Sequence, residues 1–410
     1  MSTYDEATAW LAEHWDPKLA VEDWWRLVAA EGWSAPHFPP EHGGRGLPVG
    51  SVRAVHAAFA AYGALRPPAG LGLMMAAPTI TTHGSPEQIA RYVPPILDGR
   101  AAWCQLFSEP GAGSDLAGLT TRAERDGDRW VINGQKVWSS MARQAEFGML
   151  LARTDFNVPK HAGISWFALT LDQPGVEIRP LREMTGDAVF NEVFFDDAVC
   201  ESGELIGGEG NGWAVAQTTL FHERIGIGGG LGGGFPTPGP KGGFVGTRAG
   251  DAATIAPPEG MVVGLRELID LAHEVGRADD PVIRQQLALL TTYVTINDLN
   301  ARRAKAEAAS GGGAALARIG KLSHTRITKL AAEIGAELAG ANAMLAGRDA
   351  LDEGIFSAAY VFAPASSIYG GTDEIQKNVA AEKVLGLPRE AHPDRDRPYG
   401  EVLRGRAGSA

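Results

Sequence analysis

Residues 103–140 carry the side-chain types that a planar ligand needs. An apolar run ends at Phe107, and residues 108–115 are then rich in glycine, alanine and serine, which let backbone N–H groups come close to a ligand. A hairpin with an Asp-Gly turn follows, and its second strand ends in Trp138-Ser139-Ser140, a flat ring beside two hydroxyl groups. The stretch therefore predicts one wall of a site for a planar ligand with polar edges.

Glu223 is a second candidate for chemistry, because it lies in an apolar helical stretch without a cation at helical spacing. The residues three and four positions away are Thr219, Leu220, Gly226 and Ile227. A carboxylate on an apolar stripe without an in-helix partner is expected to have a raised pKa, which suits a general base working near neutral pH. The alternative is a residue that forms a surface or interhelical salt bridge.

The elements that position these residues fall into three parts. Residues 1–100 predict an N-terminal α-helical domain with a tryptophan-rich core, because apolar residues recur at helical spacing. Residues 101–206 change to strand periodicity between Asp-Gly and Asn-Gly turns, which predicts a middle β domain, either barrel or sheet. Residues 207–390 return to long helices joined by short loops, which predicts an antiparallel helical bundle. The expected fold class is therefore α+β.

Two segments depart from this pattern. Residues 228–258 are dominated by glycine, proline and threonine, and we expect an inserted flexible loop there, with an active-site lid as the alternative. The Gly-x-Gly-x-x-Gly match in this segment follows a helix rather than a strand, so it does not indicate a nucleotide site. Residues 391–410 predict a flexible tail.

The composition narrows the class of protein. The chain has 410 residues, 44% of them hydrophobic, which is enough for two or three domains. A formal net charge of −12 disfavours nucleic acid or an anionic membrane as the main partner. The two distant cysteines, Cys104 and Cys200, indicate neither a disulfide framework nor a zinc site, so we expect no metal and a cytoplasmic location. No stretch of the sequence is typical of a targeting segment or a membrane span.

Four blocks of the sequence resemble the acyl-CoA dehydrogenase family in order and spacing. They are FSEPGAGSDLAGLTTRAE (107–124), INGQKVWSS (132–140), EMTGDAVFNEVFFDD (183–197) and YGGTDEIQKNVAAEKVLGLPRE (369–390). The resemblance implies that family's layout of N-terminal helices, middle β domain and C-terminal helical bundle. It also implies a flavoprotein oxidoreductase of fatty acid or lipid β-oxidation, which binds FAD and an acyl-CoA and passes electrons to an electron-transfer flavoprotein.

The resemblance also implies roles for individual residues. The implied cofactor-binding positions are Phe107, Ser108, Ser114, Trp138, Ser140, Gly371 and Thr372. Ser114 would face the CoA moiety as well, and Arg224 and Tyr369 are further candidates for contact with the substrate.

In much of this family the catalytic base is the Glu of a Tyr-Glu-Gly-Thr string near the C-terminus. This chain has Gly370 at that position, where only a backbone N–H is left to bind the thioester oxygen. A subset of the family keeps its base in an x-Glu-Arg element on the first long bundle helix, which Phe221-His222-Glu223-Arg224 matches. We therefore expect Glu223 to remove the α-proton while a hydride leaves the β-carbon for the flavin.

Two features of the family are missing here. Many members reach the FAD pyrophosphate of a neighbouring subunit with an Arg-x-x-Phe-Gly string, for which Arg284 is the expected substitute and Arg277 the alternative. A Gly-Gly-x-Gly loop is replaced by residues 339–344. Both losses resemble bacterial members that act on bulky acyl-CoAs or pair with a second, non-identical subunit. We expect a homodimer or homotetramer, with a heteromer as the alternative, and the sequence does not define the acyl chain.

Two other functions compete with the dehydrogenase. A flavin monooxygenase or oxidase on the same fold does not need an α-proton base, so the presence of Glu223 argues against it. A non-catalytic or half-site subunit of a heteromeric acyl-CoA dehydrogenase would instead complete the site of another chain.

Overall fold

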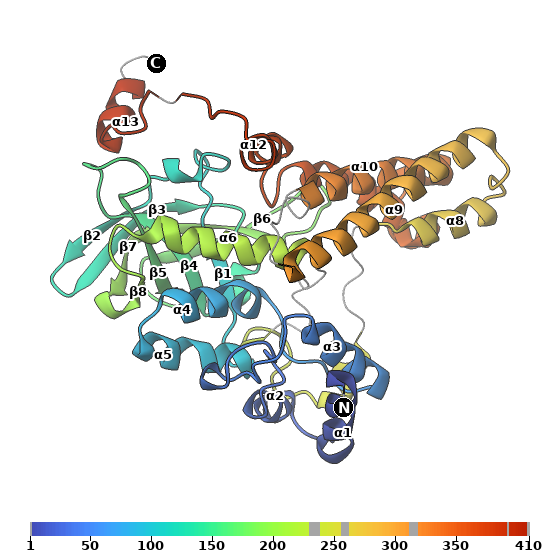
Figure 1. The fold of residues 1–410 in the computed structure, drawn as a ribbon, viewed down its shortest axis with the longest axis horizontal. Coiled ribbons are helices and arrows are strands. Elements are labelled where there is room, and N and C mark those ends of the chain that lie inside the picture. The colour runs from blue at the N-terminus through green and yellow to red at the C-terminus, as the bar shows by residue number, and fades with distance from the viewer. Residues whose placement is uncertain (1, 229–237, 256–261, 311–318, 392, 408–410) are drawn as a thin grey trace. The chain divides into compact units, whose positions relative to one another are not determined.

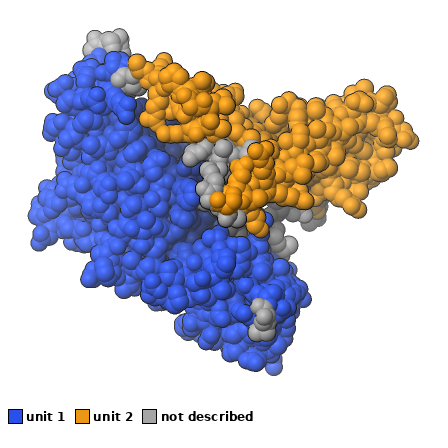
Figure 2. Space-filling model, viewed as in Figure 1, with its two compact units in different colours: residues 1–182, 188–258, 392–410 blue, residues 183–187, 259–391 orange. Residues whose placement is uncertain are grey.

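The computed structural model describes residues 2–228, 238–255, 262–310, 319–391 and 393–407 (Figure 1). The chain forms two compact units, coloured separately in Figure 2. Unit 1 comprises residues 1–182, 188–258 and 392–410, and unit 2 comprises residues 183–187 and 259–391.

The N-terminal part of unit 1 is helical, as predicted. Its helices are α1 (Thr3–His14), α2 (Val21–Ala30), α3 (Ser51–Tyr62), α4 (Ala77–His83) and α5 (Pro86–Leu97). The tryptophan core is confirmed, because Trp24 and Trp33 are buried and their ring centroids lie 5.5 and 6.1 Å from that of Trp10. Each of these rings removes a large apolar area from water, so they dominate the packing energy of this helical layer.

The middle of unit 1 is an eight-stranded sheet with the order β6-β7-β3-β2-β4-β5-β8, and β1 pairs with β4. The strands are β1 (Trp103–Leu106), β2 (Arg122–Asp126), β3 (Arg129–Lys136), β4 (Phe147–Arg153), β5 (Ile164–Thr170), β6 (Val176–Leu181), β7 (Phe190–Glu201) and β8 (Leu205–Ile206). The predicted Asp-Gly turn joins β2 to β3 at Gly127, where φ is 62°. Alternation along β1 sends Trp103 into the core shared with the helices and Cys104 into the core on the other side of the sheet.

Helix α6 (Gly212–Gly228) lies against β5 and α4 within unit 1 (Figure 1). Residues 207–390 are predicted to form the C-terminal bundle, and within unit 1 this helix packs on the sheet and the N-terminal helices. Val215 and Ala216 are buried in the core that contains Trp103, and the hydroxyl oxygens of Thr79 and Thr219 lie 3.0 Å apart across the helix pair.

The described part of the predicted flexible insertion is packed rather than free. Residues 238–255 include a short helix, α7 (Ala249–Thr254), whose Ala249 and Ala252 are buried in the tryptophan core. Phe244 is 8% exposed, and its ring meets Trp25 edge to face. One aromatic residue and two alanines therefore bury apolar surface that packs this glycine-rich part against the N-terminal helices. Residues 229–237 and 256–258 lie outside the described residues.

The C-terminal segment also differs from the expected flexible tail. It forms α13 (Tyr399–Ala407), and the Tyr399 side chain is 3% exposed. The Tyr399 hydroxyl donates to the Gly118 carbonyl oxygen at 2.6 Å, and the Arg153 guanidinium lies 4.1 Å from the ring centroid. One buried aromatic residue therefore anchors this segment to unit 1.

Unit 2 is a set of helices, namely α8 (Leu265–Glu274), α9 (Pro281–Ala309), α10 (Gly320–Ala339), α11 (Ile355–Phe362) and α12 (Asp373–Lys383). Helix α10 packs on α9, α11 and α8 around a core that includes Leu268, Ile334 and Phe356. It ends at Ala339 because Gly340 adopts a φ of 56°, which leaves the helical region. Among the helices of the described residues, none is long and apolar enough to cross a membrane.

The anchoring of the C-terminal segment gives a testable prediction. We expect Tyr399→Ala to release α13 and to speed tryptic cleavage after Arg404, followed by mass spectrometry, since truncating a large aromatic side chain in a core costs roughly 3 kcal/mol. Tyr360→Ala removes an exposed ring and is the matched control. Equal cleavage rates in Tyr399→Ala and the wild type would contradict the anchoring role.

Candidate active site

A buried ion pair fixes the loop that follows β1. The Lys136 ammonium lies 2.8 Å from a Glu109 carboxylate oxygen, and the two side chains are 0% and 5% exposed. Lys136 also donates to the Phe107 carbonyl oxygen at 2.9 Å. The Glu109 carboxylate accepts the backbone N–H groups of Thr120 and Thr121 at 2.7 and 2.9 Å. These bonds tie the loop after β1 to the end of β3 and to the start of β2.

The charges of this pair are set by opposing effects. Burial by itself raises the pKa of Glu109, but the Lys136 ammonium and the donated hydrogen bonds outweigh it and lower that pKa to about 2. Burial lowers the pKa of Lys136, and the Glu109 carboxylate opposes that shift. Because each charge has its partner and its hydrogen bonds, the pair is tolerated in the interior.

The structure brings four of the predicted cofactor residues together at one edge of the sheet. The Val137 N–H donates to the Ser108 carbonyl oxygen at 2.9 Å, so the chain at Phe107 and Ser108 runs beside the chain that leads to Trp138 and Ser140. The loop then closes on itself through two backbone hydrogen bonds between Glu109 and Ala112, and Ser114 lies exposed beyond this turn.

Trp138 is held in an unusual conformation. Its φ is 61°, in the left-handed region that residues with a Cβ rarely adopt, and the residue is 57% exposed. Its ring meets Phe190 edge to face at 5.7 Å. Paired backbone hydrogen bonds between Ser139 and Asn191, at 3.0 and 3.1 Å, fix the chain at this point. Strained residues held by their surroundings cluster at ligand sites.

These residues fit the FAD that the resemblance implies. An exposed flat ring with a fixed backbone suits stacking on one face of an isoalloxazine, and the hydroxyls of Ser108 and Ser140 suit its polar edge. The Ser139 hydroxyl is buried without a hydrogen-bond partner among the described residues, which marks a polar position beneath the same strand end.

Glu223 lies against β1. The Gln105 side-chain amide donates to Glu223 Oε2 at 3.0 Å, and Gln105 lies on β1 two residues before Phe107, which directly follows the strand. Burial raises the pKa of Glu223, while the Gln105 hydrogen bond and the charge of Arg224 act in the lowering direction. The direction agrees with the expectation from the sequence. Among the ion pairs between described residues, none involves Glu223.

Two histidines of unit 1 have lowered pKa values, and one of them is the neighbour of Glu223 in the sequence. Burial lowers the pKa of His222, which precedes Glu223 in α6. Burial also lowers the pKa of His37, and the charge of His222 lowers it further. Neither ring therefore supplies a cation to Glu223 near neutral pH.

The other predicted site residues belong to unit 2. Gly370 and Gly371 have φ values of 63° and 87°, a conformation that disfavours a glutamate at position 370. Thr372 caps α12 by accepting the Ile375 N–H at 3.2 Å, and His324 Nε2 lies 3.2 Å from the Tyr369 hydroxyl. Their part in the site stays a prediction.

The two candidate arginines for the FAD pyrophosphate differ in their surroundings. Arg277 is engaged inside unit 2, because it pairs with Asp280 at 2.6 Å and donates to the Glu337 carbonyl oxygen at 3.0 Å. Arg284 lies 4.0 Å from Asp279, and its side chain is mostly exposed. Arg284 is thus the better placed of the two to bind an anion, which remains a prediction.

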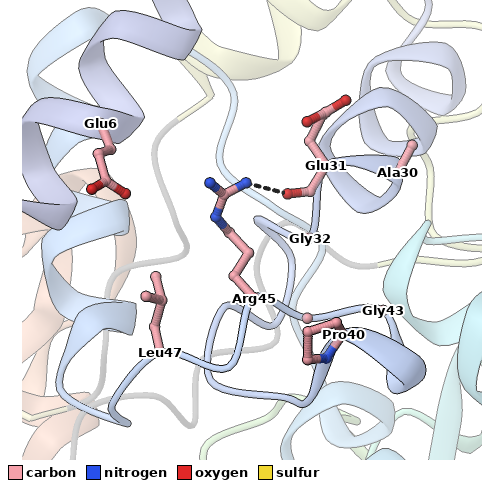
Figure 3. A pocket seen from close by; sticks show the side chains of 9 residues that line it. Glu6, Ala30, Glu31, Gly32, Pro40, Gly43, Arg45 and Leu47 are labelled. Atoms are coloured by element: carbon pink, nitrogen blue, oxygen red, sulfur yellow. Dashed lines mark hydrogen bonds between the residues drawn. The ribbon is translucent and has the colours of Figure 1, made fainter.

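A cavity of about 380 Å³ lies elsewhere in unit 1 and contains none of the predicted site residues (Figure 3). Its cation, Arg45, donates to the Glu31 carbonyl oxygen at 2.8 Å and lies over the Trp33 ring. Glu6 also lines this cavity. The cavity has neither the aromatic wall nor the convergent hydroxyls of the sheet edge, so it is not the candidate site.

Three family models match most of the chain. Residues 3–100 match the acyl-CoA dehydrogenase N-terminal domain, residues 104–198 the middle domain and residues 255–385 the C-terminal domain. The "Acyl-CoA dehydrogenase IpdE1" of Mycobacterium tuberculosis is 39% identical over 372 residues, which cover 90% of this chain and 88% of that protein.

Solved structures resemble the whole chain. The "ChsE4-ChsE5 complex from Mycobacterium tuberculosis" has a TM-score of 0.69 at 25% identity, covering 95% of this chain and 97% of the matched chain. The "Tcur3481-Tcur3483 steroid ACAD" has a TM-score of 0.71 at 24% identity, covering 94% and 97% respectively, and this likeness shows the fold alone.

The buried ion pair beneath the site gives a second prediction. Lys136→Met leaves the Glu109 carboxylate buried without its cation, and breaking such a pair costs about 3–5 kcal/mol, so we expect a lower urea midpoint of unfolding. Adding Glu109→Gln to Lys136→Met removes the stranded charge and should restore part of the loss. Lys18→Met, at an exposed lysine, is the control. A single variant as stable as the control would refute the role of the pair.

Proposed function

Since this chain belongs to the acyl-CoA dehydrogenase family of flavin-dependent oxidoreductases, we propose that it oxidises an acyl-CoA thioester to the 2,3-enoyl-CoA with bound FAD. The residues proposed to hold FAD are the positions that the family resemblance implies, with Arg284 as the substitute for the missing arginine. They are Phe107, Ser108, Trp138, Ser140, Gly371, Thr372 and Arg284.

Glu223 takes the role of the general base. The proton on the carbon next to a thioester carbonyl is weakly acidic, so its removal needs a positioned base whose pKa is close to the working pH. Burial raises the pKa of Glu223 in that direction. The α-proton passes to the Glu223 carboxylate as the hydride leaves the β-carbon, and the flavin, when bound, supplies the two-electron acceptor for this chemistry.

Four further residues bind the substrate in this proposal. The backbone N–H of Gly370 donates to the thioester oxygen, which favours the charge that develops there. Ser114, Arg224 and Tyr369 contact the CoA or acyl part. Glycine at position 370 is compatible with this role, because the donor is the main chain and needs no side chain.

One observation carries the proposal. The Gln105–Glu223 hydrogen bond of 3.0 Å joins the carboxylate to β1, two residues before Phe107. Two residues of extended chain span about 7 Å, which is the separation of Gln105 and Phe107 along the backbone. The bond to Gln105 therefore holds the base close to the strand end that carries the predicted flavin contacts.

The assembly is part of the proposal. On α9, Val282, Leu289 and Ile296 recur every seven residues and are 44–56% exposed. An apolar stripe of this kind is typical of a surface covered by a partner. We infer a homodimer or homotetramer, or a heteromer like the ChsE4-ChsE5 complex, that passes electrons to an electron-transfer flavoprotein in the cytoplasm.

A third prediction tests the base directly. We expect Glu223→Gln to keep the yellow colour of bound FAD and to lose turnover by about a thousandfold, since positioned bases contribute that order. The measurement is anaerobic bleaching of the flavin by a panel of straight-chain, branched, aromatic and steroid-derived CoA esters. Glu13→Gln, at an exposed helical carboxylate, is the control.

The same preparation separates the alternatives. Near-normal bleaching in Glu223→Gln would refute the assignment of the base. A wild-type chain that is colourless until a second polypeptide is added would favour the half-site subunit. Rapid reaction of the reduced protein with oxygen would favour an oxidase or monooxygenase.

A fourth prediction concerns pH. Because Glu223 must be ionised to accept the proton and burial raises its pKa, kcat/KM should fall as the pH drops through a value above that of an ordinary glutamate. The measurement is the pH dependence of kcat/KM for the CoA ester that bleaches the flavin fastest. An acid limb at the ordinary value of a glutamate would contradict the effect of burial.

A further inference from the structure

We propose that Gln105 is the positioning residue for Glu223, in that its side-chain amide fixes the carboxylate beside β1 in the orientation for proton abstraction. The inference rests on the proposed function, because that function makes Glu223 the base that removes the proton. The contact itself rests on geometry within unit 1, where the Gln105 Nε2–Glu223 Oε2 distance is 3.0 Å.

The place of Gln105 in the sheet argues for a dedicated role. Side chains alternate along β1, so Gln105 shares a face with Trp103, which is buried among the N-terminal helices. Its neighbour across the parallel pairing with β4 is Met149, which is fully buried. A polar amide on an otherwise apolar face costs free energy unless it is hydrogen-bonded, and Glu223 is the partner it has.

The strand holds the amide in place. Residues 103–106 of β1 all pair with residues 147–150 of β4, so hydrogen bonding between the two strands fixes the backbone at Gln105. Glu223 comes from α6, which packs on β5 and α4. The hydrogen bond therefore spans 118 positions of the sequence and joins two rigid elements.

A glutamine suits this position chemically. Its amide N–H₂ donates a hydrogen bond and carries no charge at any working pH. It therefore stabilises the ionised carboxylate without the strong lowering of the Glu223 pKa that a cationic partner would cause. A lysine or arginine there would lower the pKa of Glu223 far more and weaken the base. With the amide, burial still raises the pKa of Glu223 while the hydrogen bond moderates the shift.

The charged groups around Glu223 do not duplicate this role. Arg224 on α6 lowers the pKa of Glu223 through its charge, and His222 and His37 have pKa values lowered by burial. On α4, His83 bonds to the Thr218 hydroxyl at 2.8 Å. Among the hydrogen bonds between described side chains, the one to the Glu223 carboxylate comes from Gln105.

The chain offers a matched control. Gln135 on β3 donates from its side-chain amide to the Glu192 carboxylate at 3.1 Å, which is the same chemical pair at another place on the sheet. Gln105→Met and Gln135→Met therefore make the same change of shape and polarity, and only the first removes a donor from Glu223.

The experiment has two readouts on the FAD-loaded protein. In Gln105→Met we expect anaerobic flavin bleaching, with the CoA ester that works best on the wild type, to slow on the order of tenfold, because a hydrogen bond to a charged group is lost. The acid limb of its pH profile should move to higher pH, since the lost bond favours the ionised carboxylate. Gln135→Met should keep the wild-type rate and profile.

The second readout does not need turnover. An infrared difference spectrum between the wild type and Glu223→Gln isolates the carboxyl band of Glu223, and its pH titration reports the protonation of that group. We expect the titration midpoint to rise in Gln105→Met and to stay unchanged in Gln135→Met. If Gln105→Met does not fold, Gln105→Glu keeps the shape and places a like charge at the site, which should raise the midpoint as well.

The outcomes separate this inference from the proposed function. An unchanged infrared midpoint and an unchanged acid limb in the Gln105 variant overturn the positioning role. Full activity of Glu223→Gln overturns the base, while a raised infrared midpoint in Gln105→Met would still support control of Glu223 by Gln105.

Discussion

The ion pair between Lys136 and Glu109 is the interaction on which the candidate site depends. A lysine with no exposed surface binds both the Glu109 carboxylate and the Phe107 carbonyl oxygen, and so joins the end of β3 to the loop after β1. The Val137–Ser108 backbone bond joins the same two strand ends, which carry the predicted flavin contacts. Burying two charges is costly, which is consistent with a position where exact placement of the chain matters more than stability.

The base shares this frame through β1. Phe107 is held by the ion pair, and Gln105, two residues earlier, holds Glu223. A single four-residue strand therefore links the proposed flavin contact to the proposed base. Position 370 near the C-terminus is a glycine and carries no carboxylate, so only its main chain can take part, through hydrogen bonding.

Two segments outside the candidate site are also held by single buried side chains. Phe244 anchors the described part of a glycine-rich insertion, and Tyr399 anchors the C-terminal helix to the turn at Gly118. In both cases one aromatic residue stabilises a stretch whose composition predicts flexibility. Composition gives the average apolar content of a segment. Whether the segment packs against the domain depends on whether one large side chain can be buried there.

The sequence by itself determined the succession of helical, strand and helical parts, the family, and Glu223 as the candidate base. Periodicity, turn residues and motif strings are local, and a short window contains them. The burial of Lys136, the contact of Gln105 with Glu223 and the packing of α6 on the sheet were decided only by the tertiary structure. These depend on residues far apart in the chain, and a buried side chain looks no different in sequence from an exposed one of the same type.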